Sequence, residues 1–207
     1  PPLVDDAAAR ADWEADLAMV REEARRSAKV LDSARENDRT HTEIQGWLRD
    51  LGLALGFAVW IAANDRSRSY AGGTLCDGCL ENLPQDMASA PGADAVRLID
   101  VLWIDRELNR VAAAFEVEHT TSIHSGIVRL LDLALGAPAA TAHGLFLVAP
   151  DDREQEVRAQ LQRPAFRRVA DLDVRYLSYG ELERNRDTMA RFGQGLKPIE
   201  AVARRLT

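Results

Sequence analysis

Three carboxylates interrupt two of the most apolar stretches of this sequence. Asp100 lies in the run Val96–Ile104, and Glu116 and Glu118 lie in the run Arg110–Glu118. A charge that is removed from water costs several kcal/mol unless another group compensates it. We therefore expect the three acids to act together, and a shared divalent cation is the simplest compensation for negative charges at close range.

A polar segment between the two runs predicts an antiparallel β-hairpin. With a turn centred near Glu107, Asp100 pairs with Ala114, and Glu116 becomes its diagonal neighbour on the same face at roughly 7–8 Å. Glu118 shares this face because side chains alternate along a strand. The alternative is an edge hairpin with solvent-exposed acids, but the apolar residues on its opposite face require a packed partner.

Hydrophobic periodicity predicts the elements that position this hairpin. We expect helices at about 5–37, from about 40, from about 121, after 151 and at 179–192, with further strands at 57–62, 144–149 and 174–177. This order predicts an α/β fold with a mixed β-sheet flanked by helices. We interpret 1–38 as an N-terminal helix for dimerisation or linkage, and 39–207 as the main domain.

Composition limits the possible functions. The chain has 207 residues, of which 46% are hydrophobic, and its net charge of −7 disfavours a purely electrostatic nucleic-acid binder. No apolar run reaches the roughly 18–20 residues of a membrane helix, and no signal peptide is visible, so we expect a cytoplasmic protein. The start at Pro1 predicts a piece of a longer polypeptide. Cys76 and Cys79 lack a second ligand pair for zinc and are expected to be loop thiols.

The hairpin and its flanks resemble the PD-(D/E)XK nuclease superfamily, which has a restriction-endonuclease-like αβββαβ core. Asp100, in Leu98-Ile99-Asp100-Val101, matches the acid on the second strand, and Glu116-Val117-Glu118 matches the Glu-x-Lys of the third. The segment 115–133 is similar to one found in bacterial restriction and defence proteins. The resemblance covers about residues 40–180.

The resemblance implies a Mg²⁺ or Mn²⁺ site. Its ligands would be Asp100, Glu116, Glu43 on the preceding helix and the carbonyl of Val117. Glu43 has an alternative role, which is to close a capping box with the residue three positions before it. Gln45 is expected on the solvated side of the same helix, although it is within reach of the site.

The sequence departs from the family at the lysine position, which Glu118 occupies. Some restriction enzymes of this superfamily carry Glu-x-Glu and still cut, so Glu118 is expected to position or deprotonate the attacking water. Because lysine occurs only at positions 29 and 197, the positive charge at the phosphate must come from arginine. The candidate phosphate contacts are Arg66, Arg68, Arg129, Thr120, Thr121 and Ser122.

The resulting hypothesis is a divalent-metal-dependent DNA endonuclease domain of bacterial restriction or antiviral defence. It would act on DNA as a homodimer, because double-strand cleavage favours two-fold symmetry, and it would work with other parts of a longer polypeptide or with defence-system subunits. One alternative is a catalytically inactive module that keeps the nuclease fold for DNA binding or assembly. Another is an RNase, including one directed at tRNA.

Overall fold

A six-stranded mixed β-sheet forms the centre of the protein. The computed structural model describes residues 14–25, 39–90, 92–119, 123–136, 144–166 and 172–206. The sheet has the order β1 (Ala58–Ile61), β4 (Val101–Ile104), β5 (Val111–Val117), β6 (Gly144–Ala149), β7 (Val174–Ser178) and β8 (Arg204–Arg205). The pairs β1–β4, β4–β5 and β7–β8 are antiparallel, and the pairs β5–β6 and β6–β7 are parallel. The predicted mixed α/β fold is confirmed.

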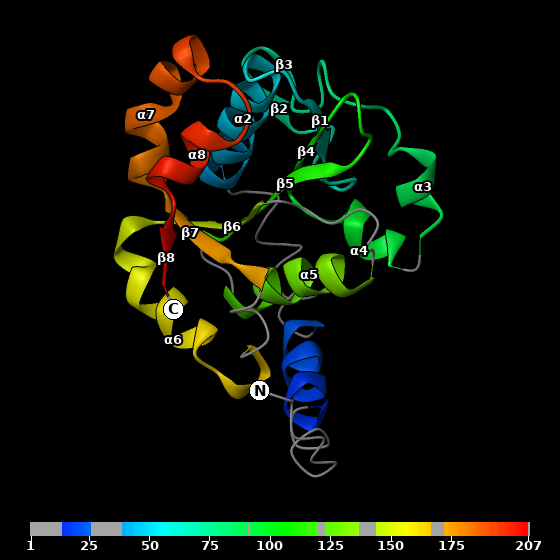
Figure 1. The fold of residues 1–207 in the computed structure, drawn as a ribbon, viewed down its shortest axis with the longest axis vertical. Coiled ribbons are helices and arrows are strands. Elements are labelled where there is room, and N and C mark those ends of the chain that lie inside the picture. The colour runs from blue at the N-terminus through cyan, green and yellow to red at the C-terminus, as the bar shows by residue number, and fades with distance from the viewer. Residues whose placement is uncertain are drawn as a thin grey trace.

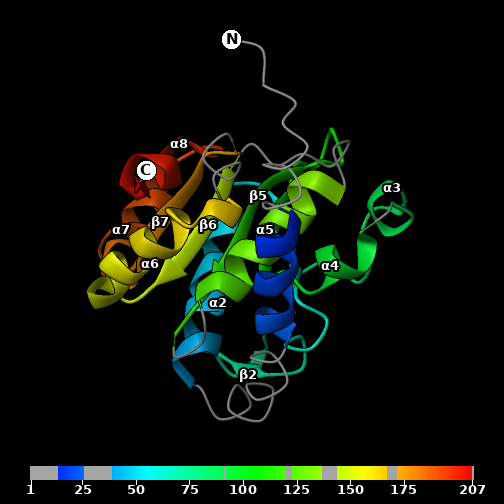
Figure 2. The same cartoon turned by 90° about the horizontal axis from the view of Figure 1, so that it is seen from below.

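Helices cover both faces of this sheet (Figures 1 and 2). One face packs against α2 (Arg39–Ala54), α7 (Tyr179–Phe192) and α8 (Lys197–Val202) in a core that includes Leu48, Trp103 and Phe115. The other face packs against α4 (Ala93–Arg97), α5 (Ile123–Gly136), α6 (Glu154–Leu161) and the helix at 14–25. The strands β1, β4, β5 and β6 are therefore buried on both sides, so a charged side chain within them needs an electrostatic partner.

Contacts between α2 and the sheet place the first turn of the helix near the end of β1. A short turn joins α2 to β1, so the two run in opposite directions and the first turn of α2 lies near the end of β1. The indole of Trp103 on β4 donates to the carbonyl of Leu48 at 3.0 Å. Gly52 permits this contact, because a Cβ at that position would lie 2.3 Å from the indole nitrogen.

The predicted hairpin forms, but two details of its prediction were wrong. Residues 93–97 are helical and β4 begins only at Val101, so Asp100 precedes the strand. Ala114 pairs with Leu102, and Val101 pairs with Phe115. The difference arises because the turn is longer than expected and the register shifts between Trp103 and Ile104. Such an irregularity changes the pairing of every residue beyond it.

The segment at 64–92, which reads as a long loop, contains small elements. It includes the antiparallel pair β2 (Ser69–Tyr70) and β3 (Gly73–Thr74), and the helix α3 (Gln85–Ala88). Cys76 and Cys79 follow β3 in a turn and are both free thiols, as expected. A 3-10 turn (Asp151–Arg153) precedes α6. Within the described residues, no helix is long and apolar enough to cross a membrane.

The helix at 14–25 packs onto the sheet domain of its own chain, beside α5 (Figure 2). Leu17 and Val20 are buried in the same core as α5, and Arg21 pairs with Asp132 at 2.6 Å. This part of the apolar stripe is thus covered without a second copy. The remainder of the helix expected at 5–37 lies outside the described residues, so the boundary at residue 38 and the homodimer stay predictions.

Candidate active site

The acidic residues meet where β5, β6 and β7 end and β4 begins. β4 is antiparallel to β5, so the residue before β4 lies next to the end of β5. Extending the register Val101–Phe115 by one residue places Asp100 opposite Glu116, and residues directly opposite each other share a face of the sheet. Asp100, Glu116 and Glu118 are all fully buried.

Asp100 connects the two strands through its carboxylate. Its Oδ2 accepts a hydrogen bond from the amide of Val117 at 2.8 Å. Its Oδ1 lies 3.6 Å from Nε2 of His41 and accepts a longer hydrogen bond, at 3.5 Å, from the side-chain amide of Gln45. The two oxygens of Asp100 therefore face different neighbours, one in the sheet and one on α2.

Glu116 is paired with an arginine on the helix that follows. Nε and Nη2 of Arg129 on α5 both donate to Oε2 of Glu116, the former at 2.8 Å. Oε1 is buried and, within the described part of the chain, has no hydrogen-bond partner. Burial raises the pKa of Glu116 to about 8; Arg129 opposes this shift, while the charges of Asp100 and Glu118 add to it. The buried site thus disfavours the charged form of Glu116 unless a further positive charge compensates it.

Glu118 lies beside the same arginine. Its Oε1 is 3.5 Å from Nη2 of Arg129 and accepts a hydrogen bond from Oγ of Ser125 at 3.3 Å. α5 approaches this closely because position 126 is glycine: a Cβ there would lie 2.7 Å from Oε1 of Glu118 and 3.2 Å from Cβ of Glu116. Burial opposes the charge of Arg129, but the neighbouring carboxylates outweigh it and raise its pKa, so Arg129 stays charged.

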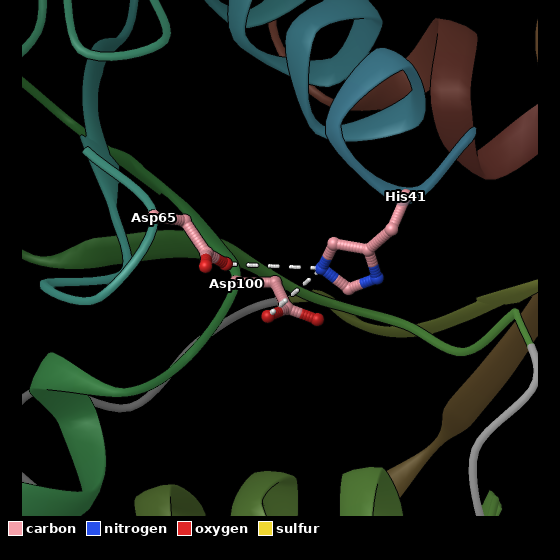
Figure 3. Close-up of side chains that lie close together, drawn as sticks. All are labelled: His41, Asp65 and Asp100. Atoms are coloured by element: carbon pink, nitrogen blue, oxygen red, sulfur yellow. Dashed lines mark ion pairs between the residues drawn. The ribbon is translucent and has the colours of Figure 1, made fainter. Parts of the chain in front are cut away.

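A histidine and a further aspartate join the site from the opposite side. His41 and Gln45 lie four residues apart in α2 and share a face of it, and Asp65 follows β1 in a turn. Nε2 of His41 is 3.8 Å from Oδ2 of Asp65, and the three side chains of His41, Asp65 and Asp100 converge (Figure 3). Gln45 donates to Oδ2 of Asp65 at 2.7 Å.

His41 and Asp65 were not predicted from the sequence, and the predicted position of Gln45 on the solvated side was wrong, because Gln45 is 0% exposed. One signal was available for the helix: His41 and Gln45 are spaced like the buried Ile44 and Leu48. Asp65 gave a weaker signal, because an acid that follows a buried strand is common in surface turns. Asp65 differs from such surface acids only through its place in the fold, where α2, β1 and β4 meet.

The remaining predicted residues lie in different places. Glu43 is exposed, and it is two positions from both His41 and Gln45, so it projects from another side of α2. Arg68 pairs with Asp65 at 3.0 Å, and the guanidinium of Arg66 stacks 4.8 Å from the ring of Trp60. The structure does not bring Glu43 to the acids. Thr120, Thr121 and Ser122 lie outside the described residues.

Comparison with known proteins finds similarity to a type II restriction enzyme. Residues 20–197 match the family model of the type II restriction enzyme NmeDI C-terminal domain. The type II restriction enzyme NmeDI of Neisseria meningitidis serogroup C is 33% identical over 150 residues, which make up 70% of this chain and 42% of that relative. The chain thus matches less than half the length of this relative. No solved structure matches.

Proposed function

The chain belongs to the family of the type II restriction enzyme NmeDI C-terminal domain, and on this basis we propose that it is a divalent-metal-dependent DNA endonuclease domain of the PD-(D/E)XK type. The observation that carries the proposal is the buried pair Asp100 and Glu116 at the junction of β4 and β5. The element order α2, β1, β4, β5, α5 and β6 agrees with the αβββαβ core expected of that superfamily.

The residues present fit a divalent cation. Oε1 of Glu116 is buried with no hydrogen-bond partner among the described residues, and the raised pKa of Glu116 reflects uncompensated burial. We assign Asp100, Glu116 and the carbonyl of Val117 to Mg²⁺ or Mn²⁺. Glu43 is left out of this set because its side chain is exposed. When bound, the cation supplies Lewis acidity towards the phosphate and lowers the pKa of a coordinated water.

Glu118 and Arg129 together would take the two roles of the lysine that other members of the superfamily have at this position. Arg129 is always charged and therefore stabilises negative charge at the phosphate but accepts no proton. Its pairing with Glu116 and Glu118 fixes its guanidinium beside the acids. The role of orienting and deprotonating the attacking water then belongs to Glu118, the remaining carboxylate of the motif.

A cleavage assay tests this function. Wild-type protein is incubated with plasmid DNA and, separately, with RNA in Mg²⁺ or Mn²⁺, beside Asp100→Asn and Glu116→Gln. We expect DNA cleavage by the wild type and a loss of at least ~10²-fold in the variants, because a ligand or catalytic carboxylate is removed. Asp187→Asn, a change at an exposed acid of α7, serves as the matched control and is expected to cut normally.

Glu118 in place of lysine favours one second candidate, a module that binds DNA without cutting it. Binding by the wild type without cleavage in either metal would support that module and contradict the endonuclease. Cleavage restricted to RNA would instead identify an RNase.

We further propose that the domain acts in restriction or antiviral defence in the cytoplasm, with DNA as its partner, as a homodimer and within a longer polypeptide or with further defence subunits. Two-fold symmetry would give one site for each DNA strand. Light scattering on the purified protein measures the oligomeric state, and a monomer at high concentration would contradict the dimer.

A further inference from the structure

We propose that His41, Asp65 and Asp100 form a second divalent-cation site, which shares Asp100 with the site assigned to Asp100 and Glu116. The sharing of Asp100 rests on the proposed function. The grouping of His41 and Asp65 as ligands rests only on the distances within the cluster. The cluster lies between the start of α2, the turn after β1 and the residue before β4 (Figure 3).

The distances within this cluster suit ligands of one ion. Nε2 of His41 lies 3.6 Å from Oδ1 of Asp100 and 3.8 Å from Oδ2 of Asp65, both longer than a hydrogen bond between nitrogen and oxygen. Ligands at ~2.1 Å from a tetrahedral cation are about 3.4 Å apart. One ligand atom from each of the three residues lies within 4.8 Å of the others, so a small contraction would close the site around a cation.

The charge at the cluster supports the same inference. His41, Asp65 and Asp100 are 2%, 4% and 0% exposed, so two carboxylates are nearly removed from water. Arg68 pairs with Oδ1 of Asp65, and the amide of Val117 donates to Oδ2 of Asp100. In each carboxylate, one oxygen therefore pairs with a protein group outside the cluster, which is Arg68 for Asp65 and the amide of Val117 for Asp100. The other oxygen faces the imidazole of His41.

Gln45 provides independent support. Its side chain is fully buried, and its Oε1 has no hydrogen-bond partner within the described ranges, although its Nε2 donates to Asp65 and Asp100. A half-turn of the amide exchanges the positions of nitrogen and oxygen. With a cation in place, the oxygen would face the cluster as a further ligand, which removes an unsatisfied buried acceptor.

The ligand types indicate which ion this site prefers. An imidazole with carboxylates suits Mn²⁺, Co²⁺ or Zn²⁺, whereas Mg²⁺ prefers oxygen ligands and keeps several waters. The neighbouring site contains only oxygen ligands. We therefore expect excess Mg²⁺ to displace Mn²⁺ from the site with Glu116 while Mn²⁺ remains beside His41.

Pulsed electron paramagnetic resonance of Mn²⁺ tests the proposal on the full chain without DNA. A directly coordinated imidazole nitrogen produces a nitrogen modulation of the Mn²⁺ electron spin echo. We expect this modulation in the wild type in excess Mg²⁺, its loss in His41→Asn, and its persistence in Glu116→Gln. His124→Asn is the matched control: His124 is a buried histidine on α5, outside the cluster, and its loss should leave the modulation unchanged.

Circular dichroism and thermal unfolding without metal show whether each variant is folded. If His41→Asn does not fold, Asp65→Asn is used instead, with an expected loss of Mn²⁺ affinity of at least ~10-fold. Absence of nitrogen modulation in the wild type, or its persistence in folded His41→Asn, would overturn the proposed site. A wild type that shows the modulation but cuts no DNA would instead contradict the endonuclease function and leave this site supported.

Discussion

At the scale of single residues, the site consists of buried charges that depend on one another. Arg129 contacts both Glu116 and Glu118, and Asp100 adds a third carboxylate nearby. The presence of acids in apolar runs could be recognised in the sequence because buried strands are otherwise apolar. Arg129 was expected near the site as a phosphate contact, but its pairing with Glu116 and the approach of His41 could not be recognised, since arginine and histidine are both common on helix surfaces.

Removal of Arg129 should destabilise the fold strongly. In Arg129→Ala, Glu116 would remain buried without the guanidinium that pairs with it, and breaking a buried pair in this way costs about 3–5 kcal/mol of unfolding free energy. Urea unfolding in the absence of divalent metal measures the loss. Arg184→Ala is the control, because Arg184 is exposed and its ion pair with Glu181 lies at the surface, so we expect less than about 1 kcal/mol. Equal losses in the two variants would show that the buried pair contributes no more than a surface pair.

At the scale of elements, the sequence predicted the types and order of the main helices and strands because hydrophobic periodicity is a local property. It did not predict that α4 would precede Asp100 or that the register would shift near Trp103 and Ile104. A shift of register depends on how two strands twist against each other, which no local pattern records. The cluster at His41 and Asp65 was missed for the same reason, because α2 and the turn after β1 meet only in the folded chain.

The junction of β7 and β8 should respond to pH through Asp173. Partial burial alone would raise the pKa of Asp173, but hydrogen bonds from Arg175 and Arg205 outweigh it and lower the pKa. A lowered pKa stabilises the fold above the ordinary Asp range, near 3.9, and this contribution is lost as pH falls through the folded-state pKa. Asp173→Asn should therefore be less stable at neutral pH, by up to about 1 kcal/mol for these partly exposed pairs.

The comparison uses thermal or urea unfolding of wild type and Asp173→Asn as a function of pH. Asparagine tolerates the positive φ of 52° at this position, so the substitution removes charge without adding backbone strain. The difference in stability should disappear in strong acid. A difference that is constant across pH would show that the carboxylate charge is not its cause.

At the scale of the whole molecule, the sheet brings acidic residues from the start of β4, the end of β5 and the turn after β1 to one place, and helices on both faces exclude water from them. Some of the acidic side chains that contribute to the net charge of −7 are therefore buried inside the fold. The fold holds buried negative charge that a divalent cation would compensate, so we expect cation binding to stabilise the entire domain.

Divalent metal should raise the unfolding temperature. A ligand that binds only the native state stabilises it by about 2.7 kcal/mol at 100 times its dissociation constant. We expect this increase on adding Mg²⁺ or Mn²⁺ after chelation, and we expect Asp100→Asn to abolish most of it, because Asp100 contributes to both proposed cation sites. Asp187→Asn should keep the full increase. A similar increase in the two variants would indicate that the metal binds elsewhere.

Anomalous diffraction from a crystal soaked in Mn²⁺ tests most directly whether Asp100, before β4, and Glu116, on β5, hold a cation together. We expect an anomalous peak in contact with both Asp100 and Glu116. A crystal in which Mn²⁺ contacts neither residue, or in which Asp100 and Glu116 lie too far apart to contact one ion, would contradict this expectation.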